Sequence, residues 1–120
     1  MNDVTYGRIL RLEGLLLTAA GLAHLVYCAL FLDWSVQPLV ANLGALAFGV
    51  AYTFLGAQMA LGRDRLLPIT LIINICGFVA VMVAGENSPL IAIDPYLVVV
   101  DLISIPTLIW LNIMKRRDGN

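Results

Sequence analysis

Residues 66–84 read LLPITLIINICGFVAVMVA, a stretch without a charged residue. A helix needs about 20 mostly apolar residues to cross the roughly 30 Å hydrocarbon core of a bilayer. Three further segments are almost as apolar, and we predict spans over residues 9–32, 38–61, 66–84 and 96–114. The chain of 120 residues is therefore expected to form a single membrane domain, residues 1–120, with four transmembrane helices.

The composition excludes several classes of protein. Hydrophobic residues make up 61 % of the chain and charged residues 12 %, whereas soluble domains average roughly 45–50 % and about 25 %. A chain this short cannot bury so much apolar surface within itself, which argues against a soluble enzyme, a disulfide scaffold or a disordered tail. The net charge of −1 gives no support to nucleic-acid binding. The lipid bilayer is the expected partner.

The connections between the predicted spans are short and rich in turn-forming residues, as in residues 85–89, GENSP. Short connections make consecutive helices antiparallel neighbours. The predicted fold is therefore all-α, an integral membrane four-helix bundle with up-down-up-down topology.

The distribution of basic residues predicts the orientation. In the four-span arrangement all seven Lys and Arg residues fall on one side of the membrane: Arg8, Arg11, Arg63, Arg65, Lys115, Arg116 and Arg117. The two opposite loops carry Asp33, Glu86 and Asp94 instead. Because basic residues in short loops mark the cytoplasmic side, we expect a multi-pass protein of the plasma (inner) membrane with both termini in the cytoplasm.

Polar residues inside the spans are the candidates for function, because ionisable groups there usually face the bundle interior. At about 1.5 Å per residue, His24 lies roughly 12 Å, Asp101 about 8 Å and Asn42 about 6 Å below the outer interface. We expect a His24–Asp101 pair in which the carboxylate favours the imidazolium, with Tyr27 and Asn42 nearby. Such a group can line an outward-facing pocket for a small ligand or a proton. The alternative is structural: hydrogen bonds between membrane helices contribute about 0.6 kcal/mol on average.

A second polar layer is predicted near the cytoplasmic ends, formed by Glu13, Gln58 and Asn112. We interpret it as an interfacial salt-bridge and capping layer, in which Glu13 can pair with Arg63 or Arg65. No metal or cofactor site is predicted, because the single His has no Cys or second His at ligand spacing.

Small residues recur along two of the spans. In the second span Ala41, Ala45, Gly49 and Thr53 follow one another at spacing four, with Gly56 and Ala60 after them; the first span has Gly14, Thr18 and Gly21. Small residues at this spacing allow helix backbones to approach closely. The pattern leaves open whether the partner helix belongs to the same chain or to another.

Three families of four-span proteins resemble this chain in part. Small multidrug transporters carry a Glu in the first span, but Glu13 lies near the basic end and the other spans differ. Fluoride channels have a segment similar to residues 42–44, NLG, but residues 71–78 lack the Gly- and Phe-rich broken helix of that family. The chain resembles most the DoxX-like membrane proteins, through residues 8–11, RILR, the Gly-rich first span, residues 42–49, NLGALAFG, and the basic turn that follows. This resemblance implies a helical bundle and transfers no catalytic residue.

Two functions remain after these exclusions. The first is a helix-packing module or accessory subunit of a membrane assembly, forming a homo-oligomer or joining a larger complex. The alternative is a small-molecule or proton-coupled transporter or ligand-binding bundle, with its outward-facing site around His24 and Asp101. A membrane enzyme is the least favoured class, because no nucleophile–base pair or metal set is present.

Overall fold

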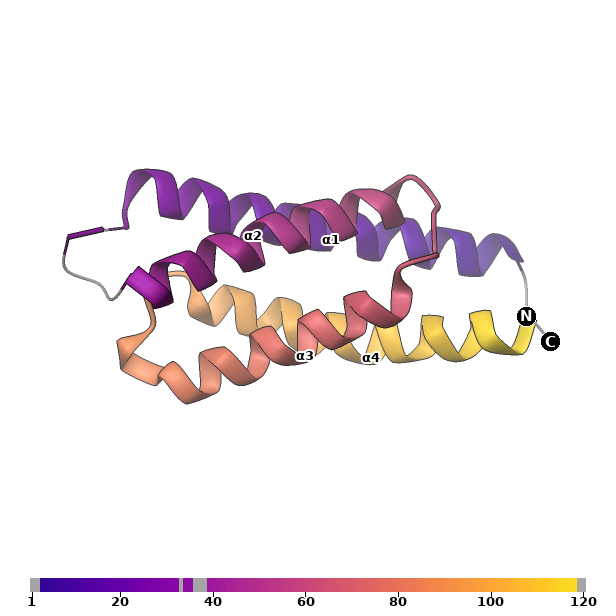
Figure 1. Cartoon of the computed structure of the whole chain (residues 1–120). Helices are drawn as coiled ribbons and strands as arrows, with labels where there is room; N and C mark the ends of the chain where they lie inside the picture. The colour runs from indigo at the N-terminus through magenta and orange to yellow at the C-terminus, as the bar shows by residue number, and fades with distance from the viewer. Residues whose placement is uncertain (1–2, 33, 36–38, 119–120) are drawn as a thin grey trace.

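The computed structural model describes residues 3–32, 34–35 and 39–118, and within these ranges it is all-α. The elements are α1 (Asp3–Leu30), α2 (Leu39–Ala60), α3 (Leu67–Ala84), the short 3₁₀-helix η1 (Gly85–Asn87) and α4 (Asp94–Asp118). The long helices lie alongside one another, and each reverses the direction of the one before (Figure 1). The start of α1, the α2–α3 connection and the end of α4 share what we call the terminal end; the opposite end is the distal end.

The all-α prediction is confirmed, and the four long helices are each apolar enough to cross a membrane: Val4–Leu30, Leu39–Ala60, Leu67–Asn87 and Asp94–Arg117. At the terminal end the first and last helices extend beyond the predicted spans. The first helix begins at Asp3 instead of residue 9, and the last ends at Asp118 instead of residue 114. Hydropathy predicts only the apolar part of a helix, whereas backbone hydrogen bonding continues through turns that carry charged side chains.

Glycine brings α1 and α2 into backbone contact. A Cβ atom added at Gly14 would lie 2.6 Å from the carbonyl oxygen of Gly56, and one added at Gly56 would lie 2.7 Å from that of Gly14. One added at Gly49 would lie 2.8 Å from Cβ of His24. The hydroxyls of Thr18 and Thr53 donate to carbonyls one turn back, each at 2.7 Å, so they add no unpaired group to this interface. The part of the small-residue pattern from Gly49 to Ala60 therefore has a partner helix within the chain.

The interior consists of two apolar clusters. The cluster in the terminal half contains the larger side chains, Leu10, Leu17, Met59, Leu67, Leu108 and Leu111. The cluster in the distal half is formed by Ala20, Cys28, Ala45, Tyr52, Leu90 and Leu97. Because two alanines and a cysteine replace leucines there, less side-chain volume is available to fill the space between the helices at the distal end.

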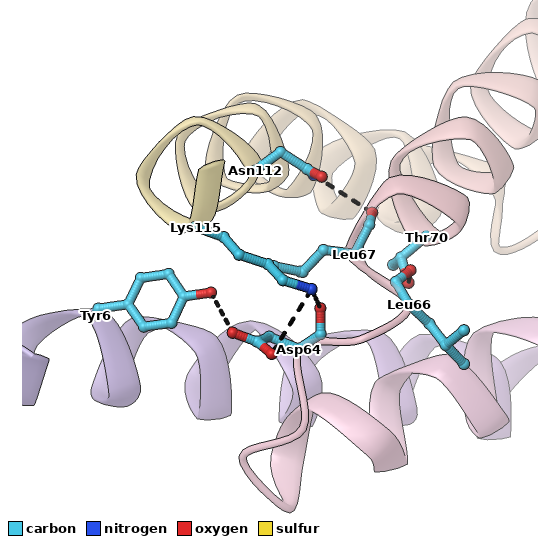
Figure 2. A network of polar contacts seen from close by, with 7 residues as sticks. All are labelled: Tyr6, Asp64, Leu66, Leu67, Thr70, Asn112 and Lys115. Atoms are coloured by element: carbon cyan, nitrogen blue, oxygen red, sulfur yellow. Dashed lines mark hydrogen bonds and ion pairs between the residues drawn. The ribbon is translucent and has the colours of Figure 1, made fainter. Parts of the chain in front are cut away.

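A polar network ties the helices together at the terminal end (Figure 2). The Tyr6 hydroxyl donates to Asp64 Oδ2 at 2.8 Å, and Lys115 Nζ donates to the backbone oxygen of Asp64 at 2.7 Å and lies 3.7 Å from its Oδ1. Asn112 Nδ2 reaches the Leu67 carbonyl at 3.3 Å. The α2–α3 connection is thus joined to both α1 and α4.

Candidate ligand pocket at the distal end

A cavity of about 210 Å³ lies at the distal end and is lined by residues of all four long helices and the α3–α4 connection. Most of its wall is apolar. The small residues of the wall come from two helices: Ala41, Gly44 and Ala45 of α2, and Gly77, Ala80 and Ala84 of α3. Side chains of this size cannot fill the space between α2 and α3, which explains why the cavity exists there.

His24 enters this cavity from α1 and is 6 % exposed. Its Nδ1 lies 2.9 Å from the carbonyl oxygen of Ala20, one turn back. Because a carbonyl oxygen only accepts, we assign the proton to Nδ1. The ring packs edge-to-face against that of Tyr52, with centroids 5.5 Å apart. Hydrogen bond and ring contact together restrain the imidazole.

Asp101 of α4 is 3 % exposed and accepts a hydrogen bond from the Tyr52 hydroxyl, with the two oxygens 3.4 Å apart. Tyr52 can reach it because Gly77 leaves room: a Cβ atom at position 77 would collide with the phenol oxygen. Phe48, one turn before Tyr52, packs against its ring at a centroid distance of 6.1 Å. The hydroxyl of Tyr52 thus extends from α2 across the cavity to the Asp101 carboxylate on α4.

Asp94 begins α4 and provides the third ionisable side chain of the cavity. It is 5 % exposed, and neither carboxylate oxygen has a hydrogen-bond partner among the described residues. Ser88, in the connection before it, accepts a hydrogen bond from the backbone N–H of Leu90 at 3.1 Å. Buried carboxylate oxygens normally accept hydrogen bonds. Asp94 departs from this rule at both of its oxygens.

The expected direct pair between His24 and Asp101 is not formed. No hydrogen bond or ion pair joins these two described residues; His24 binds Ala20 and Asp101 binds Tyr52. Both nevertheless line one cavity, as depth counting suggested. The direct pair fails because a backbone carbonyl lies within reach of Nδ1 and because Tyr52 contacts both side chains.

Two residues of the site, Tyr52 and Asp94, were missed by sequence reasoning. Tyr52 lies near the middle of its span, where an aromatic residue is expected to be ordinary core. The fourth span is predicted to begin at residue 96, which leaves Asp94 and Pro95 in the preceding loop. Proline is, however, common in the first turn of a helix, and that signal could have placed Asp94 at a helix start.

The other two candidate residues lie outside the lining of this cavity. Tyr27 is half-buried and packs against Phe31, with ring centroids 5.5 Å apart. Asn42 is fully buried, and both polar atoms of its side chain lack a partner in the described part of the chain.

The second polar layer differs from the interfacial layer that was expected. Glu13 is 4 % exposed and faces Ser104 in the bundle interior, and its Oε1 has no hydrogen-bond partner within the described ranges. It makes no ion pair with Arg63 or Arg65, because both of those side chains are exposed while Glu13 points inward.

The two remaining residues of that layer do lie near the terminal end. Gln58 accepts from Arg63 at 3.4 Å beside a wider hollow of about 500 Å³ whose lining includes Arg65. Asn112 donates to the carbonyls of Leu67 and Leu108. This hollow holds no buried unpaired group of the described residues, so the distal cavity is the stronger candidate site.

The described His, Cys, Asp and Glu side chains form no group of three or more that could hold a metal ion. His24, Asp94 and Asp101 therefore share a cavity without converging on one point. No protein-family model matches this sequence, and comparisons with curated proteins and with solved structures also found no match.

Proposed function

We propose that the four helices span the plasma membrane, with both termini in the cytoplasm. Large apolar side chains exposed on the outside of the bundle, such as Val40, Val83 and Leu30, support contact with lipid. All seven basic residues belong to the terminal end, and residues 31–38 and 85–93 contain no Lys or Arg. The basic excess favours a cytoplasmic terminal end.

Reporter fusions test this orientation. A fluorescent protein fused after Asn120 should fluoresce, and alkaline phosphatase inserted after Glu86 should be active. Phosphatase activity from the C-terminal fusion would overturn the orientation.

We further propose that the protein binds a small molecule in the distal cavity, which faces outward in this orientation. The cavity itself carries the proposal: it is a largely apolar space between four helices into which three buried ionisable groups project. Binding sites combine such apolar walls with a few polar groups that orient the ligand. Its 210 Å³ exceed the engineered cavity of about 150 Å³ that takes benzene.

The competing function, a helix-packing module or accessory subunit, has less support. It was motivated by the small-residue pattern, and Gly49 and Gly56 of that pattern already pack against α1. A defined oligomer or complex isolated from native membranes would favour this function.

Binding of a small aromatic probe tests the proposed pocket. We would titrate n-propylbenzene into the protein in phosphatidylcholine nanodiscs and follow alanine methyl resonances by NMR. Saturable shifts should appear at Ala45, which lines the cavity and is buried, and not at the exposed Ala23. Unspecific partitioning into lipid would shift Ala23 as well.

The variant Gly44→Leu provides the matched control. Gly44 lines the cavity, and a Cβ atom there meets nothing within 4 Å. A larger side chain can therefore enter the cavity without moving the backbone and should abolish the saturable shifts. Saturable binding that persists in Gly44→Leu would place the probe elsewhere and refute this pocket.

A further inference from the structure

Most hydrogen-bond donors in the side chains of the distal cavity already donate to other groups of the protein. His24 donates through Nδ1 to Ala20, and Tyr52 donates through its hydroxyl to Asp101. In the neutral imidazole Nε2 is then an acceptor. Apart from the Ser88 hydroxyl, the side-chain hydrogen-bonding capacity left in the lining consists of acceptors.

The acceptors of the cavity also lack a counter-charge. Both oxygens of Asp94 are buried without a partner among the described residues, and Asp101 receives one long hydrogen bond. The two distal connections contain no Lys or Arg, and all described basic side chains belong to the terminal half. An unpaired buried carboxylate is costly, and a cation that donates hydrogen bonds compensates that cost.

The apolar wall of the cavity indicates what the uncharged part of the ligand is like. Phe48, Leu90 and Leu97 contribute apolar wall around the ionisable groups. A bare metal ion would leave this wall uncovered, and the acidic side chains do not converge on one metal position. A hydrocarbon body with a charged head fits both parts of the lining.

We propose that the ligand of the distal cavity is a primary or secondary ammonium compound with a small apolar body. Its head group donates to Asp94, whose two oxygens are buried and unpartnered among the described residues, and its apolar part lies between α2 and α3. This assignment deepens the proposed pocket function and rests on it. A free amine and an amine-bearing lipid share this head-group chemistry.

Three probes of similar size and different charge test the assignment. We would measure the affinities of 2-phenylethylammonium, n-propylbenzene and 3-phenylpropionate in phosphatidylcholine nanodiscs, using the same methyl resonances. The ammonium probe should bind at least about tenfold more tightly than the neutral one, because only its head group donates charge-assisted hydrogen bonds to the buried carboxylate. The anion should bind most weakly.

Variants locate the origin of that preference. Asp94→Asn should reduce the ratio of ammonium to neutral affinity by about tenfold. Asp101→Asn should reduce it less, because seven helical residues, about 10 Å along the axis, separate the two carboxylates. Glu86→Gln removes the same charge from an exposed position at the same end and should leave the ratio unchanged. The wild-type ratio needs no variant, so the assignment remains testable if an Asp variant fails to fold.

The outcomes separate the two proposals. Equal affinities of the ammonium and neutral probes, or tightest binding of the anion, would overturn the ammonium assignment and leave the pocket intact. Absence of saturable binding by all three probes would refute the pocket and the assignment together. Weaker binding of 2-phenylethylammonium after phosphatidylethanolamine is added would support the assignment and identify the lipid as the source; an unchanged affinity would support a free amine.

Discussion

Gly77 of α3 lies directly against the hydroxyl of Tyr52, at the point where that phenol reaches Asp101 across the distal cavity. A single methyl group at position 77 would occupy the place of the phenol oxygen. Because Gly77 has no side chain, Tyr52 of α2 can pass α3 and contact Asp101 of α4.

Gly77→Ala should displace the Tyr52 hydroxyl from Asp101. The lost hydrogen bond is long, with the two oxygens 3.4 Å apart, and contributes about 0.5–1.5 kcal/mol. Overpacking by the added methyl group costs about 1–3 kcal/mol more, and the better helix propensity of Ala returns at most about 1 kcal/mol. We expect a net loss of about 1–3 kcal/mol in the free energy of unfolding, measured by mixed-micelle denaturation followed by circular dichroism.

In a Tyr52→Phe background, Gly77→Ala should raise the free energy of unfolding instead of lowering it. Without the hydroxyl, the nearest ring atom is Cζ of residue 52, which would lie 3.4 Å from the added Cβ atom. Ala at position 77 should then stabilise the helix by up to about 1 kcal/mol. Equal effects in both backgrounds would contradict the steric explanation.

Gly14→Ala should force α1 and α2 apart. The new Cβ atom would meet backbone atoms of α2, including Met59 C at 2.7 Å, and backbone atoms cannot rotate away. Overpacking of this kind costs typically about 1–3 kcal/mol. Gly7→Ala on the same helix is the control, because nothing lies within 4 Å of its Cβ atom. If both variants unfold at the same denaturant concentration, the close α1–α2 packing is wrong.

Lys115→Met should destabilise the protein more than Asp64→Asn. The first substitution removes both the ion pair and the bond to the Asp64 backbone oxygen. The second leaves the backbone bond in place and keeps one side-chain oxygen that can accept from Tyr6. Because the two charged side chains are 39 % and 37 % exposed, the ion pair itself contributes less than about 1 kcal/mol. The measurement is the free energy of unfolding of each variant.

Salt provides a further check on this ion pair. At 1 M salt the Debye length falls to about 3 Å, so the difference between Asp64→Asn and wild type should shrink. Arg116→Met, at an exposed position, should change stability by less than about 0.5 kcal/mol. A loss in Asp64→Asn that matches Lys115→Met would assign the stabilisation to the carboxylate alone.

Glu13→Met should stabilise the protein. The Glu13 side chain is buried with an oxygen that no described residue satisfies, and an unsatisfied buried group costs about 1–3 kcal/mol. An apolar side chain of similar volume removes that cost. Glu86→Gln, at an exposed position, should change the unfolding free energy by less than about 0.5 kcal/mol. A destabilised Glu13→Met variant would instead indicate that Glu13 has a partner in the membrane.

The polar residues of the spans illustrate how far sequence reasoning reached. Counting residues along each helix brought His24 and Asp101 to a similar depth, and both line the distal cavity. Counting could not assign their hydrogen-bond partners, because depth along an axis says nothing about rotation around it. Asn42, at a comparable depth, is buried outside the cavity lining for that reason.

The sequence by itself determined that the chain forms four long apolar helices, because hydropathy and turn residues act locally and leave a one-dimensional signal. It also placed every basic residue at one end. Only the tertiary structure decided that Gly49 and Gly56 of α2 pack against α1, that Glu13 turns inward, and that Tyr52 and Asp94 join the distal cavity. Those outcomes depend on the rotation and spacing of whole helices, which are set by the packing of side chains from distant parts of the chain.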